Sequence, residues 1–267
     1  MSTGLSLLLA ALAYALLSTG LVLMKKGIGW IGRGKTWDGG RRRDLAFWAG
    51  GFALSNLSIV PSTMALKALE PQAVAAMAGW GVVLMVLLAR VVLGEKLYAS
   101  DAGYTVLVFA GIVILNLAGP KGPGGIAEPA RLSVAAAVPA VLFAAAFIGG
   151  LRRKGRAVLL ATVSGLSTGM IVVLMKALVG LYGFRVPAYF SSPWFYLYLV
   201  FSLAAFLSLQ MAYRMEALMK TGPVLYSLAI VYPAVCSVVV FGNALSAVQA
   251  AAAALIVVSV VGILRKR

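Results

Sequence analysis

The stretch that decides the fold reads LSTGLVLMK at residues 17–25 and returns halfway along the chain as LSTGMIVVLMK at residues 166–176. Both copies lie in long uncharged runs that end at a lysine. A repeat inside one chain determines how its elements are counted, because each copy predicts one copy of a structural unit. If each string opens one half of the chain, we expect a duplicated helical bundle.

The composition places this bundle in a membrane. Hydrophobic residues make up 62% of the chain and charged residues 11%, whereas soluble domains carry about 25% charged residues. A membrane-spanning helix needs roughly 20 mostly apolar residues. The runs that satisfy this rule are 4–24, 45–68, 71–92, 99–118, 132–151, 157–182, 194–213, 222–241 and 246–264. The sequence therefore predicts an all-α polytopic membrane protein with about nine transmembrane helices.

Lysine and arginine predict its orientation. If the N-terminus is outside, 18 of the 23 basic residues fall on the inner side, seven of them within residues 25–43. Such an excess marks the cytoplasmic side of a membrane protein. We therefore expect a multi-pass protein of the cell membrane, with its N-terminus outside and its C-terminus in the cytoplasm. This orientation also accounts for the formal charge of +16, so no nucleic-acid partner is expected.

The order of the spans predicts two repeats of opposite topology. Four spans fall in residues 1–118, a linker and one unpaired helix in residues 119–156, and four spans in residues 157–267. The unpaired helix reverses the direction in which the second set crosses the membrane. Inverted repeats are typical of secondary transporters, which alternate access around a site near the membrane midplane. The predicted function is secondary transport of a small solute.

Neutral polar residues inside the spans are the candidate substrate contacts, because the spans hold almost no carboxylates. They are Ser18, Thr19, Asn56, Ser62, Thr63, Ser167, Thr168, Gln210, Tyr213 and Tyr232. Interruptions at corresponding places in two halves point to a transport site. The candidate hinges are Gly20, Pro61, Gly169 and Pro233. The alternative for each hydroxyl is a hydrogen bond within its own helix or to a neighbouring helix.

Other classes of site find little support in the residue types. The chain has no histidine, so the commonest general base and the imidazole metal ligand are both absent. It has one cysteine, Cys236. No motif pairs a serine with a base, so we expect neither an enzyme nor a cofactor. A metal site is left open. The expected partners are a small-molecule or ion substrate and the lipid bilayer, and a homodimer is left open.

The string LGEKL at residues 93–97, followed by a helix with Gly103 and Gly111, resembles the turn that closes each half in the drug/metabolite transporter superfamily. FGNAL at residues 241–245 is similar to it but lacks the glutamate. LMKKG at residues 23–27 and FWAG at residues 47–50 resemble the NIPA-like, magnesium-transporting branch. The resemblance implies a transporter. Glu95 is interpreted as a structural residue that caps the helix beginning at Ala99 or pairs with Lys96.

The substrate is left open between three kinds of solute. A hydrated Mg²⁺ ion could be bound by carbonyl and hydroxyl oxygens, and an organic metabolite suits the same groups. An anionic solute could instead use Lys67, Lys176 or helix N-termini. A scaffold or lipid-carrier protein that transports nothing is the alternative class, because a fold does not fix a function.

Overall fold

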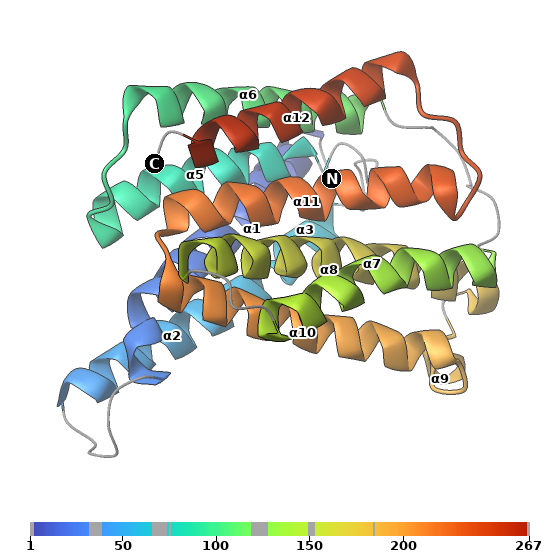
Figure 1. The fold of residues 1–267 in the computed structure, drawn as a ribbon, viewed down its shortest axis with the longest axis horizontal. Helices are drawn as coiled ribbons and strands as arrows, with labels where there is room; N and C mark the ends of the chain where they lie inside the picture. Colours follow the sequence, from blue (N-terminus) through green and yellow to red (C-terminus); the bar gives the residue numbers. More distant parts are fainter. Residues whose placement is uncertain are drawn as a thin grey trace. The chain divides into compact units, whose positions relative to one another are not determined.

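The structure, a computed structural model, describes residues 3–31, 39–65, 74, 76–118, 128–148, 153–183 and 185–265. Within these residues every regular element is a helix and none is a strand. The elements are α1 (Thr3–Gly27), η1 (Ile28–Ile31), α2 (Gly39–Leu57), α3 (Ile59–Ala65), α5 (Ala78–Leu93), α6 (Ala99–Leu117), α7 (Pro129–Ile148), α8 (Arg153–Tyr182), α9 (Val186–Tyr189), α10 (Pro193–Met215), α11 (Leu218–Val239) and α12 (Ala247–Arg265), labelled in Figure 1.

Eight helical segments of the described residues are long and apolar enough to cross a membrane. They are Gly4–Trp30, Gly39–Ala65, Ala99–Leu117, Pro129–Phe147, Gly155–Tyr182, Pro193–Met215, Leu218–Val239 and Ala247–Arg265. A helix satisfies its own backbone hydrogen bonds, which is what a lipid environment requires. The chain is therefore an all-α, multi-pass membrane protein, and this part of the prediction is confirmed.

The third predicted span, 71–92, is described as the shorter apolar helix α5 of 16 residues. At 1.5 Å per residue such a helix is about 24 Å long, less than the roughly 30 Å of a hydrocarbon core. Residues 66–73 and 75, which would extend it or join it to the preceding span, lie outside the described residues. The count of nine spans stays a prediction.

Helix packing divides the chain into two compact units. Unit 1 consists of Met1–Gly119, Glu216–Pro223 and Val248–Arg267, and unit 2 of Pro120–Met215 and Val224–Ala247. The predicted division at residues 118 and 156 concerns internal symmetry, which compactness does not test. It stays a prediction, and residues 119–127 of its linker lie outside the described residues.

Helix α1 lies at the centre of unit 1, where it packs against α2, α3 and α5. Its approach to α2 is close enough to require glycine. A Cβ atom placed on Gly20 would lie 2.6 Å from the carbonyl oxygen of Gly51 and 2.7 Å from the backbone nitrogen of Ser55. Small residues allow membrane helices to approach in this way and to gain dispersion contacts along their whole length.

Unit 2 is organised around α8, which packs against α7 and α10. The core of this unit is apolar and is contributed by α7, α8, α10 and α11. Its largest buried members include Leu132, Met170, Leu174, Phe201 and Tyr232. A Cβ atom on Gly165 would lie 2.7 Å from the carbonyl oxygen of Leu225, so α8 and α11 are also in close contact.

The turns that follow α5 and α11 are built alike. Gly94 and Gly242 both have φ of +68°, a left-handed conformation that glycine adopts without strain. The N–H after each glycine donates back across the turn, from Glu95 to Ala89 O (3.3 Å) and from Asn243 to Ser237 O (3.1 Å). This arrangement closes a helix C-terminus. The next helix begins five residues after the glycine in both cases, at Ala99 and at Ala247.

Helices α6 and α12 pack against each other in unit 1 and lie side by side in Figure 1. A Cβ atom on Gly111 would lie 2.6 Å from Ile256 Cγ1, and one on Gly262 would lie 2.5 Å from the ring of Tyr104. The earlier residue of one helix thus meets the later residue of the other. The two helices are therefore antiparallel, and a glycine from each allows the contact.

Candidate functional site

The helix that follows α1 is interrupted about two thirds of the way along. Helix α2 ends at Leu57, Ser58 forms a turn, and α3 continues from Ile59. Pro61 has no N–H group, so the carbonyl of Leu57 has no helical donor four residues later. Pro61, a candidate hinge, lies three residues after the turn at Ser58.

A pocket of about 140 Å³ lies beside this break, between α1 and the α2–α3 segment. Its lining residues are Ala13, Tyr14, Leu17, Ser58, Ile59 and Ser62. Sites for drug-sized ligands usually measure roughly 300–1,000 Å³, so this pocket suits a small solute. Tyr14 lies halfway along α1, which is where a midplane site is expected in a helix that crosses the membrane.

Two hydroxyl groups of the pocket are available to a ligand. Within the described part of the chain, neither the Tyr14 nor the Ser62 hydroxyl has a hydrogen-bond partner. Ser58, in contrast, donates to Ser55 O at 2.6 Å. None of the six lining residues carries a charge. The pocket therefore offers hydroxyl donors and acceptors to a polar, uncharged group.

Ser62 is the predicted contact that the structure brings to this pocket, and Tyr14 is one that sequence reasoning missed. The other candidates of the same span point elsewhere. Asn56 and Thr63 are exposed and donate to carbonyls of their own helical segment, Phe52 O and Ile59 O, both at 2.8 Å. These two follow the alternative in which a polar side chain satisfies itself within its helix.

The repeated Ser-Thr-Gly strings lie in helices that continue without a break. Ser18 is buried and donates to Gly81 O of α5 at 2.8 Å, whereas Thr19 is half-buried. Ser167 is buried and has no hydrogen-bond partner in the described residues. Thr168 donates to Ser164 O of its own helix at 2.8 Å.

The two glycines of these strings face different kinds of neighbour. Gly20 meets backbone atoms of α2, whereas a Cβ atom on Gly169 would lie 2.9 Å from Pro233 Cδ and 3.0 Å from Tyr232 Cβ in α11. Pro233 lies within α11, which the structure describes as one continuous helix. The identical strings thus occupy different packing environments, each inside its own unit.

The remaining candidates lie in unit 2. Gln210 and Tyr213 are buried in α10. Tyr232 is buried in α11 and its hydroxyl donates to the carbonyl oxygen of Ala135 in α7. This bond links α11 to α7. Lys176 lies 4.1 Å from the centre of the Phe241 ring, and Lys67 lies outside the described residues.

Glu95 forms a second polar site in unit 1, and it caps a helix other than the one that begins at Ala99. Its carboxylate accepts hydrogen bonds from the N–H groups of Leu218 and Met219, both at 2.8 Å. It therefore caps α11. The N-terminus of α6 is instead closed by Asp101, which accepts a bond of 3.4 Å from the N–H of Tyr98.

The turn between α10 and α11, which precedes the residues bound by Glu95, is joined to the end of α1. The ammonium group of Lys25 donates to Glu216 O at 2.6 Å, and the Glu216 carboxylate pairs with Lys220 at 3.3 Å. An open pocket of about 450 Å³ beside this turn is lined by residues that include Arg90, Glu95 and Lys96. Since the Glu95 carboxylate already satisfies two backbone donors of α11, we interpret the α5–α6 turn that carries it as structural.

No group of three or more histidine, cysteine, aspartate or glutamate side chains that could hold a metal occurs in the described residues. Comparison with protein-family models, with curated proteins and with solved structures finds no match for this chain.

Proposed function

We propose that this chain is a secondary transporter of a small polar solute, and that the pocket beside the α2–α3 break is its binding site. The observation that carries the proposal is a pocket halfway along α1, next to an interrupted helix, whose Tyr14 and Ser62 hydroxyls make no hydrogen bond within the described residues. Discontinuous helices build the substrate sites of many transporters. Irregular backbone at membrane depth is tolerated where protein covers it or where it lines a cavity.

The lining residues favour an uncharged solute. Tyr14 and Ser62 can each donate and accept one or more hydrogen bonds, and Ala13, Leu17 and Ile59 contribute apolar surface. A charged solute would lose its hydration without gaining an opposite charge from these residues. Magnesium, which prefers carboxylate oxygens and retained waters, is the less favoured version for this pocket.

We further propose two inverted repeats and membership of the drug/metabolite transporter superfamily. Two observations support the repeats: the matching turns at Gly94 and Gly242, and the antiparallel packing of α6 on α12. An axis in the membrane plane relates inverted repeats and makes corresponding helices antiparallel. The proposal includes location in the cell membrane, with the N-terminus outside.

Uptake into proteoliposomes tests this function. The purified chain is reconstituted and offered labelled glycerol, urea, alanine and Mg²⁺, with and without proton and sodium gradients. We expect uptake of an uncharged solute that falls at least about tenfold in Tyr14→Phe and Ser62→Ala, since each removes a hydroxyl from a site built to bond one. Thr63→Val and Asn56→Leu serve as matched controls, because these exposed side chains bond their own helix.

Each outcome separates the alternatives. Uptake that is lost equally in the control variants would place the site elsewhere. Mg²⁺ uptake that survives both pocket substitutions would favour the magnesium version and refute the assigned pocket. A folded protein that moves none of these solutes in any gradient would favour the scaffold or lipid-carrier class.

A further inference from the structure

The end of α1, the helix η1 and the start of α2 form a closely packed corner, here called the basic corner (residues 25–31 and 39–48). A Cβ atom on Gly27 would overlap Asp44 O and the backbone nitrogen of Trp48. One on Gly29 would lie 2.8 Å from the Asp44 carboxylate. The two helices therefore meet backbone to backbone, and side chains on either helix keep fixed positions relative to each other.

The exposed charges of the basic corner are all positive. Lys26, Arg42 and Arg43 are exposed, whereas Lys25 already donates to Glu216 O. Asp44 is the one acidic residue of the corner, and its side chain is buried against the chain near Gly29. Among the described residues of the corner, the exposed charges are thus three cations and no carboxylate, which favours an anion as the partner.

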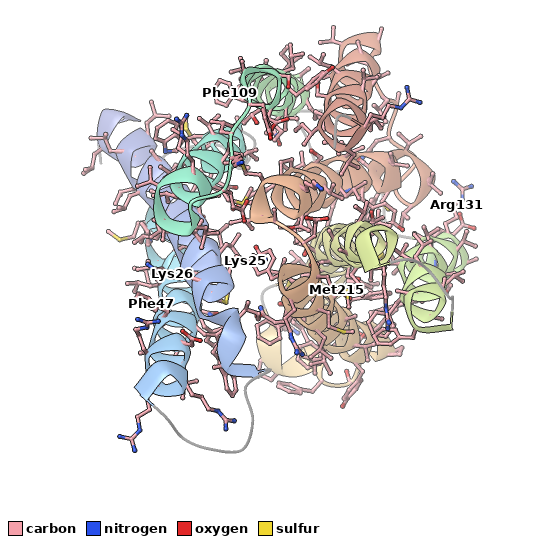
Figure 2. The ribbon with its side chains drawn as sticks, turned by 60° about the vertical axis from the view of Figure 1, so that its left-hand side comes forward. Lys25, Lys26, Phe47, Phe109, Arg131 and Met215 are labelled. Carbon is pink, nitrogen blue, oxygen red and sulfur yellow. The ribbon has the colours of Figure 1, made fainter. Side chains whose placement is uncertain are left out.

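Aromatic rings lie in the same corner and extend along α2. The Trp30 and Trp48 rings lie edge to face at 5.5 Å, and Trp48 stacks on Phe52 at 5.7 Å. The Lys26 ammonium lies 4.6 Å from the centre of the Phe47 ring, and both residues are labelled on their neighbouring helices in Figure 2. Tryptophan rings prefer the boundary between headgroups and acyl chains. The cations therefore lie beside rings suited to that boundary.

We propose that the basic corner binds the phosphate of an anionic phospholipid. Lys26, Arg42 and Arg43 would hold the headgroup, and the exposed side of Trp48 and Phe52 would contact the acyl chain. A free phosphate ion would use the cations alone and would leave the adjoining rings bare. Charge complementarity and the continuous apolar rings therefore favour a lipid. Cationic segments beside a membrane span recognise anionic lipids in this way.

Titration with a water-soluble lipid tests the proposal. The purified chain in neutral detergent is titrated with dioctanoyl phosphatidylglycerol, with dioctanoyl phosphatidylcholine and with inorganic phosphate, and binding is measured by calorimetry. We expect a clear preference for phosphatidylglycerol. Each cation lost should weaken it about fivefold, so Lys26→Gln, Arg42→Gln and Arg43→Gln combined should remove the preference. Trp48→Leu should weaken the binding of both lipids without changing the charge of the protein.

A second triple variant controls for general attraction. Arg90→Gln, Arg185→Gln and Arg265→Gln remove the same charge from exposed positions outside the basic corner and should leave the affinity unchanged. Equal loss in both triple variants would overturn the proposal, as would competition by inorganic phosphate or equal binding of the two lipids. The single variant Arg42→Gln, at an exposed first-turn position, gives the same comparison if the triple variant unfolds.

Discussion

The carboxylate of Glu95 accepts a hydrogen bond of 2.8 Å from the N–H of Leu218, which lies 123 positions further along the chain. Its second oxygen accepts an equal bond from the next residue of α11. The first N–H groups of a helix have no partner within it, and its N-terminus carries partial positive charge. One side chain of the α5–α6 turn therefore satisfies two donors and opposes that charge.

Replacing this carboxylate should destabilise unit 1. We expect Glu95→Ala to lower the free energy of unfolding by about 1–3 kcal/mol, because two backbone donors lose a charged acceptor. Glu95→Gln should fall between alanine and the native residue, because an amide has one acceptor oxygen. Equilibrium unfolding in mixed micelles measures the free energy of unfolding of both variants. Glu128→Ala is the control, since Glu128 and Arg131 form an exposed pair of little expected value. An equal loss in the control would contradict the capping role.

The contact between α6 and α12 predicts which glycines tolerate a methyl group. Gly111→Ala and Gly262→Ala should each cost about 1–3 kcal/mol, because the added Cβ atom overlaps Ile256 or Tyr104. Gly103→Ala on α6 should instead be neutral or stabilising by up to about 1 kcal/mol, because nothing lies within 4 Å of its Cβ position. Thermal unfolding of the three variants compares them. If all three behave alike, helix propensity and not packing governs these sites.

The two repeated glycines should differ in their sensitivity to alanine. At Gly20 the new methyl group would meet backbone atoms of α2, whereas at Gly169 it would meet side-chain atoms of Tyr232 and Pro233. Backbone yields less readily than side chains, so Gly20→Ala should be the more destabilising. Gly180→Ala in α8, where the Cβ position is open, is the control. Thermal unfolding temperatures and transport rates are measured for each variant. Equal losses of stability in Gly20→Ala and Gly169→Ala would contradict the expected difference.

Cysteine labelling tests the proposed orientation. Cys236 is buried, so a new surface cysteine should give the signal. Gly122→Cys should react from outside the cell with a thiol reagent that cannot cross membranes, and Lys154→Cys should react after the membrane is opened. The 18-to-5 distribution of basic residues motivates this expectation. The opposite pattern would reverse the topology.

The helical class was accessible from the sequence, because the apolar runs in lipid have few structural choices. The predicted span 194–213, for example, corresponds to α10 at Pro193–Met215. The candidate site was harder to predict. Tyr14 lies in an ordinary apolar run, and it lines a pocket with Ser62 because the helix breaks at Ser58. Which face of a helix a hydroxyl occupies depends on its neighbours, so Asn56 and Thr63 looked equivalent to Ser62. The partner of Glu95 is too distant in sequence for local reasoning to find.

The pairing of α6 with α12 also sets an order on biogenesis. Helix α6 is synthesised early, yet the atoms that cover Gly111 belong to Ala252 and Ile256 of α12. The nascent protein must therefore carry an uncovered α6 face through the synthesis of α7 to α11. Unit 1 is completed after the ribosome has released the last helix. A premature stop before α12 would thus damage the first half of the protein as well as the last.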